Sequence, residues 1–136
     1  MENTIDVIFK EPGKEAVEMT IKDDLKKYQE LVEGLIDITY LSYYNQKFRD
    51  YTAKTNRDII AIVNDNGIFE GKEPNIALDP NCQSILFGNI VFVAGELDSS
   101  DWSPLNKQEK DMIKDFCFKF AVQYQDHAKQ KDFERL

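Results

Sequence analysis

The side chains that could support catalysis are few and lie far apart in the sequence. One histidine, His127, and two cysteines, Cys82 and Cys117, are the candidates for a nucleophile paired with a base. His127 and Cys117 are expected on one helix, where a spacing of ten residues separates them by roughly 15 Å. We therefore assign no catalytic residue and expect both thiols to be reduced and dispensable for function, acting as small apolar groups.

Acidic residues form two groups that could bind a divalent cation. One is the pair Asp23 and Asp24, and the other comprises Glu96, Asp98 and Asp101. The second group has the spacing of oxygen ligands but lacks the glycine and the bidentate glutamate of a calcium loop. The six glycines are scattered and form no Gly-x-Gly-x-x-Gly phosphate loop. We therefore expect solvated acids, no metal site, no cofactor and no enzymatic activity.

Residues 43–57 combine basic and aromatic side chains, as binding surfaces often do. Such a segment can hold single-stranded nucleic acid, can anchor a protein partner, or can pack its rings on a sheet while its bases face water. The net charge of −8, from 17 basic and 25 acidic residues, makes direct nucleic-acid binding the least favoured of these. The expected partner contacts, with Arg49 and Tyr51 as anchors, are Tyr44, Lys47, Phe48, Arg49 and Tyr51.

The stretch from residue 73 to 106 contains five acidic residues and no Lys or Arg. Such a stretch could occupy a basic channel of a partner through charge complementarity. Asp98, Asp101 and Trp102 are the expected partner contacts here. Trp102 is expected outside any regular element, just before the last helix. There it either packs that helix against the sheet, which is the favoured reading, or anchors a partner.

An alternative hypothesis makes the chain a small-ligand or nucleotide-binding module. In that hypothesis the loops between residues 64 and 78 form the mouth of a pocket. The residues expected to line this mouth are Asn64, Gly67, Pro74 and Asn75.

Length and composition favour one domain over residues 1–136. Two domains would each have a marginal core, whereas 42% hydrophobic residues supply one core amply. The sequence contains no run of 18 apolar residues that could cross a membrane. Its first residues lack the pattern of a signal peptide, so a cytoplasmic location is expected. The sequence does not determine the oligomeric state.

Apolar periodicity predicts an α+β fold with an antiparallel or mixed sheet of about five strands, in the order β-β-α-β-β-β-α. One helix follows the first hairpin, and a long helix with a capping box formed by Asn106 and Glu109 ends the chain. Residues 43–57 are expected to form a loop excursion and residues 130–136 to fray. The remaining expected elements are a hairpin over 4–21, a helix from 23 to Gly34 and strands within 35–44 and 57–63. Residues 73–80 are expected to be irregular or to form a single helical turn, and residues 84–94 to form a strand pair or one bent strand.

The same periodicity predicts which side chains form the core. In the last helix, Phe118 is expected to widen the buried stripe. The side chains expected to be buried are Ile5, Val7, Leu31, Ile60, Ile62, Phe92, Phe116 and Phe120.

Three stretches together resemble one protein family. They are FKEPGK at 9–14, VNDNG at 63–67 with PNIAL at 74–78, and ILFGNIVFV at 85–93. Their order and spacing are similar to those of a domain-of-unknown-function family of small proteins carried by phages and conjugative elements of Gram-positive bacteria. The resemblance covers about residues 4–113, and the chain departs from it in the basic-aromatic segment and the long terminal helix.

Members of this family mostly lack an assigned activity, and some similar proteins look like anti-CRISPR inhibitors of an RNA-guided nuclease. The resemblance therefore implies an accessory protein of a mobile element, acting in the host cytoplasm. The expected function is to bind and inhibit a host defence protein, such as a CRISPR-associated nuclease, without chemistry of its own.

Overall fold

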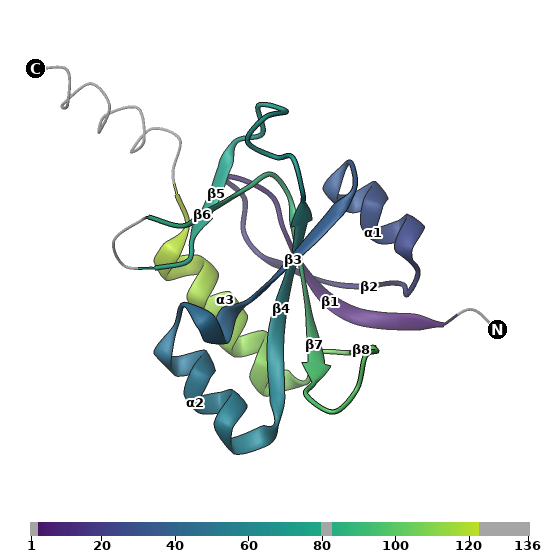
Figure 1. The fold of residues 1–136 in the computed structure, drawn as a ribbon, viewed down its shortest axis with the longest axis vertical. Coiled ribbons are helices and arrows are strands. Elements are labelled where there is room, and N and C mark those ends of the chain that lie inside the picture. The colour runs from purple at the N-terminus through teal and green to yellow at the C-terminus, as the bar shows by residue number, and fades with distance from the viewer. Residues whose placement is uncertain (1–2, 80–82, 123–136) are drawn as a thin grey trace, which may run out of the picture.

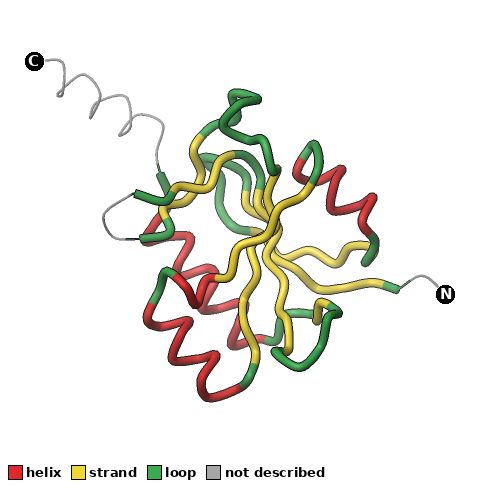
Figure 2. The backbone as a smooth tube through the Cα atoms, in the orientation of Figure 1, coloured by secondary structure: helices red, strands yellow, loops and turns green. Residues whose placement is uncertain are grey.

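The protein has an α+β fold in which helices cover both faces of an antiparallel sheet (Figure 1). The structure is a computed structural model that describes residues 3–79 and 83–122. The tube in Figure 2 shows helices on both sides of the main sheet. The predicted fold class is confirmed.

The first hairpin forms as the sequence predicts. Strand β1 (Thr4–Lys10) pairs with β2 (Val17–Lys22) in an antiparallel register. In the turn between them the Lys14 amide donates to the Glu11 carbonyl, and Gly13 has a φ of 74°. A positive φ at the third position of a Pro-Gly turn is the type II geometry that this dipeptide favours.

Strand β7 (Ile90–Glu96) lies at the centre of the main sheet, whose order is β2-β1-β7-β4-β3. Its neighbours β1 and β4 (Arg57–Asn64) both run antiparallel to it, and β3 (Ile36–Tyr40) forms the far edge. A sixth strand, β8 (Trp102–Ser103), pairs with β7 just beyond the residues that β1 occupies. Trp102 therefore belongs to the sheet edge, which corrects the expectation that it lies outside any regular element.

Alternation along the strands builds a separate core on each face. Ile60 and Ile62 of β4 point to the face covered by α1 (Leu25–Val32), where they join Tyr28. Ile59 and Ala61 point to the opposite face. Strand β4 is therefore buried on both faces, as its nearly continuous apolar run predicts.

Helices α2 (Gln46–Thr55) and α3 (Lys107–Phe120) cover the second face. Together with a 3-10 turn at Leu41–Tyr43, α2 replaces the loop excursion expected over 43–57. The Asn45 side chain caps α2 by accepting from two backbone amides, and Phe48 and Tyr51 provide its only buried side chains. Two inward rings among polar neighbours are a weak periodic signal, and for that reason the sequence suggested a loop.

A small two-stranded sheet of β5 (Pro74–Ala77) and β6 (Ile85–Phe87) lies beside α3. Its formation corrects the irregular structure expected over 73–80 and assigns the apolar stretch 84–94 to two different sheets. An isolated bridge between Ile76 and Ala121 closes the end of α3. Burial of Ile76, Leu78 and Leu86 in the same core as α3 accounts for this arrangement.

The helix ends differ in detail from the prediction. Glu33, not Gly34, takes the left-handed conformation after α1, with a φ of 64°. Gly34 is required for a different reason, because a Cβ there would lie 2.6 Å from Nδ2 of Asn64. Helix α3 ends at Phe120, and Phe118 is exposed, so it does not widen the buried stripe. His127 and the fraying expected over 130–136 lie outside the described residues.

Six of the eight side chains expected in the core are buried. The exceptions are Leu31 and Phe120, which are partly buried and pack against the two cores. Both lie near the end of a helix, where neighbours cover only one side.

A buried carboxylate joins α2, β4 and α3. Glu109 is fully buried, and its two oxygens accept hydrogen bonds from Nε and Nη2 of Arg57 at 2.9 and 2.8 Å. The Tyr51 hydroxyl donates to it at 2.8 Å, and the Asn106 backbone amide completes the predicted capping box at 2.9 Å. Each oxygen thus accepts two donors, which satisfies a buried charge.

Hydrogen bonding determines the charge state of Glu109. Burial by itself raises the pKa of this carboxyl, but the bonds from Arg57, the Asn106 backbone and Tyr51 outweigh it. The pKa therefore lies below its ordinary value of 4.5, and the group is ionised at neutral pH.

Replacing Glu109 by Gln is expected to lower the free energy of unfolding by about 3 kcal/mol at neutral pH, because Arg57 loses its buried partner. The measurement is urea denaturation followed by circular dichroism. The control is Asp111→Asn on the exposed side of α3, where a solvent-facing pair with Lys107 contributes no more than about 0.5 kcal/mol. Equal losses in the two variants would contradict the role given to Glu109.

Candidate functional site

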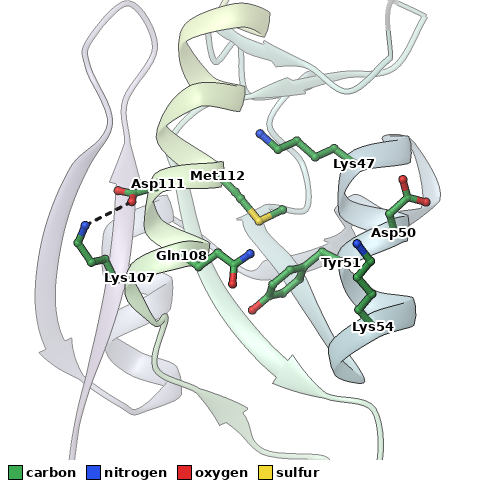
Figure 3. Close-up of a pocket in the computed structure, with 8 residues that line it drawn as sticks. All are labelled: Lys47, Asp50, Tyr51, Lys54, Lys107, Gln108, Asp111 and Met112. Atoms are coloured by element: carbon green, nitrogen blue, oxygen red, sulfur yellow. Dashed lines mark ion pairs between the residues drawn. The ribbon is translucent and has the colours of Figure 1, made fainter.

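An open groove of about 810 Å³ lies between α2 and α3 (Figure 3). In Figure 3, Gln108 and Met112 point from α3 toward α2, whereas Lys107 pairs with Asp111 on the flank of α3 away from α2. The groove is lined by Lys47, Asp50, Tyr51, Lys54, Lys107, Gln108, Asp111 and Met112.

The charges around this groove compensate one another locally. Lys47 lies 3.6 Å from Asp115, and Asp50 accepts a hydrogen bond from the Gln46 side chain. Within residues 3–79 and 83–122, Lys54 alone among the lining charges has no such contact. The groove therefore selects neither an acidic nor a basic partner by charge.

The basic-aromatic segment is used mainly inside the protein. Phe48 packs edge-to-face against Phe116 with ring centroids 5.4 Å apart, and the hydroxyl of Tyr51 is bound to Glu109. Both side chains are buried, so they offer a partner little surface beyond the part of Tyr51 that lines the groove. The packing reading of these rings is the one the structure supports, since both rings lie in the core.

Arg49 is exposed but already holds the chain before α2. Its guanidinium donates to the carbonyls of Ser42 and Tyr43 and to the side chain of Gln46. Tyr44 and Lys47 are the other two predicted contacts of this segment that reach the surface. Two rings of the segment, those of Tyr43 and Tyr44, are exposed, whereas the rings of Phe48 and Tyr51 are buried.

A second hollow, of about 620 Å³, lies where β8 meets the start of α1. Trp102 packs edge-to-face on Tyr28 at 4.9 Å between ring centroids, and it is partly buried against the α1 core. Trp102 thus packs within the protein as favoured, but its partner is α1 and not the last helix, which lies on the opposite face of the sheet. The lining residues, which we call the acidic hollow, are Asn3, Asp23, Asp24, Leu25, Tyr28, Ser100, Asp101 and Trp102.

Negative charge dominates the acidic hollow. Asp24 caps α1 by accepting from the Lys27 amide, which lowers the pKa of Asp24, and lies 3.4 Å from Lys22. Asp23 accepts from the Tyr28 hydroxyl, and burial raises the pKa of that phenol. Asp101 has no cationic neighbour among the described residues. Three carboxylates thus lie around two aromatic rings, with Lys22 paired to Asp24 and Lys26 close enough to favour its ionised form.

The sequence analysis singled out residues from both segments that line this hollow, but it did not predict that the two segments lie together. The aspartates at 23 and 24 were considered as cation ligands, and Asp101 and Trp102 as partner contacts. Pairing of Trp102 with Gly95 on β7 brings the two segments together. A two-residue strand leaves no periodic signal, so the sequence could not place them side by side. Asp98, the other predicted contact in this region, is exposed but does not line the hollow.

The four residues expected to line a ligand mouth do not share one cavity. Asn64 is buried and donates to the Val32 and Glu33 carbonyls, so it joins β4 to the end of α1. Asn64 and Gly67 line a small hollow of about 130 Å³ that excludes the other two. Pro74 begins β5, and Asn75 is buried against the side chain of Lys10.

The thiol of Cys117 lies 2% exposed in the core. Burial raises its pKa to about 12, which keeps the sulfur protonated and poorly nucleophilic. Cys82 and His127 lie outside the described residues. Across the described ranges, no three His, Cys, Asp or Glu side chains gather as metal ligands would. No helix in those ranges is long and apolar enough to span a membrane.

Comparison with known families gives one match. The model of a family described as a domain of unknown function (DUF3846) matches residues 5–117 of this chain. No curated protein and no solved structure matches the chain. The matched range includes all the described strands except the first residue of β1, and it ends three residues before the end of α3.

Tyr51→Ala is expected to lower the free energy of unfolding by about 3 kcal/mol or more, because it removes a buried ring and a donor to Glu109. Arg49→Ala is expected to cost no more than about 1 kcal/mol, since its bonds are solvent-exposed. Thermal denaturation of the two single variants measures the difference. A stable Tyr51→Ala protein would show that this side chain is not part of the core.

Proposed function

The chain belongs to the DUF3846 family, a domain of unknown function, and we propose from its structure that it is a non-catalytic protein that binds a basic surface of a protein partner. The observation that carries this proposal is the acidic hollow at β8. Its contents suit an arginine or lysine side chain, which gains both ion pairs with carboxylates and a cation–π contact with an aromatic ring.

The surroundings of the hollow support the same role. Leu25 on its wall and Leu97 beyond the end of β7 are each more than half exposed, and they offer apolar area next to the charges. Asp98 adds a further exposed carboxylate. Interfaces commonly combine an apolar centre with a polar rim, and the net charge of −8 would guide a basic partner toward the molecule.

The partner we propose is a host defence nuclease, and the protein would be an accessory of a phage or another mobile element. The resemblance described above suggests this partner class, and the chemistry of the surface agrees with it. An RNA-guided nuclease holds its nucleic acids in a positively charged channel. An acidic domain that occupies this channel competes with the phosphate backbone and inhibits the enzyme.

The test is cleavage of target DNA by a purified RNA-guided nuclease of a Gram-positive bacterium, with increasing amounts of this protein. We expect inhibition that weakens as salt concentration rises. Asp101→Lys should weaken inhibition about tenfold or more, because it places a cation in the acidic hollow. The matched control is Asp65→Lys, which makes the same charge change after β4, at the opposite end of the sheet from β8.

Two results would contradict the proposal. One is the absence of both inhibition and binding by the unmodified protein. The other is equal weakening by the two lysine variants, because the effect would then follow from net charge and not from the acidic hollow. Binding without inhibition would retain the interface and remove the inhibitory role.

A further inference from the structure

A buried lysine ends strand β1. Lys10 is only 2% exposed, and its ammonium donates hydrogen bonds to the Glu11 carbonyl at 2.8 Å and to Oδ1 of Asn75 at 3.0 Å. Neither acceptor carries a charge. In residues 3–79 and 83–122 no carboxylate forms an ion pair with this ammonium, whereas proteins normally pair a buried charge.

The ammonium is also incompletely hydrogen-bonded. A lysine ammonium has three N–H donors, and the two bonds above leave one without an acceptor in the described part of the protein. Burial lowers the pKa of Lys10, although the neighbouring Cys117 and Glu11 oppose that shift. The protein therefore holds a buried charge here that neither an ion pair nor a full set of hydrogen bonds compensates within the described residues.

Asn75 fixes the position of this ammonium. Its side chain is fully buried, and its Nδ2 donates to the carbonyls of Lys10 and Gly88 at 2.9 and 2.7 Å. With both amide hydrogens committed, the amide oxygen must face Lys10. The amine is thus held in place before any ligand arrives, which lowers the entropy cost of binding.

A cavity of about 450 Å³ opens beside Lys10. Two further amines, those of Lys14 and Lys114, line it together with one acid, Glu15. Cys117 and the exposed ring of Phe118 provide apolar wall. The volume lies in the range of small-molecule sites. Lys14 and Lys114 already pair with Glu11 and Glu18, so Lys10 is the lining amine that has no carboxylate partner in residues 3–79 and 83–122.

We propose that this cavity binds a small organic anion. Its carboxylate or phosphate group accepts a hydrogen bond from the third N–H of Lys10, and its apolar part lies against Cys117 and Phe118. The ligand supplies the counter-charge that the protein lacks. This site shares no lining residue with the acidic hollow, so it does not depend on the proposed nuclease partner.

The first test is calorimetric titration of the full chain with three probes: benzoate, phenyl phosphate and inorganic phosphate. Binding of at least one is expected at millimolar concentration, with the aromatic probes tighter than inorganic phosphate. Preference for benzoate assigns a carboxylate ligand and preference for phenyl phosphate assigns a phosphate ligand. Failure of all three to bind would overturn the proposal.

Lys10→Met is expected to lower the affinity for the probe about tenfold or more, because a charged hydrogen bond is lost. The matched control is Lys14→Met, which removes the same charge from an exposed lysine of the cavity wall and should weaken binding less than about threefold. Equal weakening in the two variants would mean diffuse attraction to surface lysines, which overturns the proposal.

A measurement on the unmodified protein covers the case in which Lys10→Met fails to fold. The titration of Lys10 is followed by NMR of its ¹³Cε with and without the best probe. An anion at the ammonium favours its charged form, so the pKa of Lys10 should rise when the probe is present. An unchanged titration in the presence of a bound probe would place that probe elsewhere and overturn the proposal.

Discussion

The fold depends on satisfying one buried carboxylate, that of Glu109. Its four hydrogen bonds come from Tyr51 on α2, Arg57 on β4 and the first turn of α3, so a single group connects both helices of this face to the sheet. Removing any donor leaves part of a buried charge unsatisfied, which is among the costliest defects a core can contain. This constraint also explains why a segment that looks like a binding surface is devoted to internal structure.

Sequence patterns predicted those elements that are stabilised by residues close together in the chain. Three structures were predicted from a few consecutive residues, and each is confirmed: the apolar strand β4, the Pro-Gly turn and the capping box at Asn106. Helix α2 and strand β8 were missed because tertiary contacts stabilise them: two buried rings for the helix, and one neighbour on β7 for the strand. The capping box identified Glu109 as a helix cap, but its partner Arg57 lies 52 residues away and no local pattern could supply it.

The candidate sites show the same division. The sequence singled out Asp101, Trp102 and Asn75, but their neighbours come from distant segments, and the fold alone reveals an acidic hollow and an amine-lined cavity. The register places these two sites at opposite ends of β7, since Trp102 pairs with Gly95 and Lys10 pairs with Ile90. The two binding sites that we propose, one for a basic protein surface and one for a small anion, are therefore separated along a single strand.

The central claim is that ionised Glu109 holds α2, β4 and α3 together, and its pH dependence tests this most directly. The folded-state pKa of Glu109 lies below the ordinary value of 4.5, so its contribution is complete above that pH and is lost as pH falls through the folded-state pKa. The measurement is the difference in free energy of unfolding between the unmodified protein and Glu109→Gln across the acid range. We expect a difference that is largest near neutral pH and shrinks below about pH 4.5, where the carboxyl takes up a proton in the unfolded chain before it does so in the folded protein. A difference that stays constant throughout the acid range would contradict it.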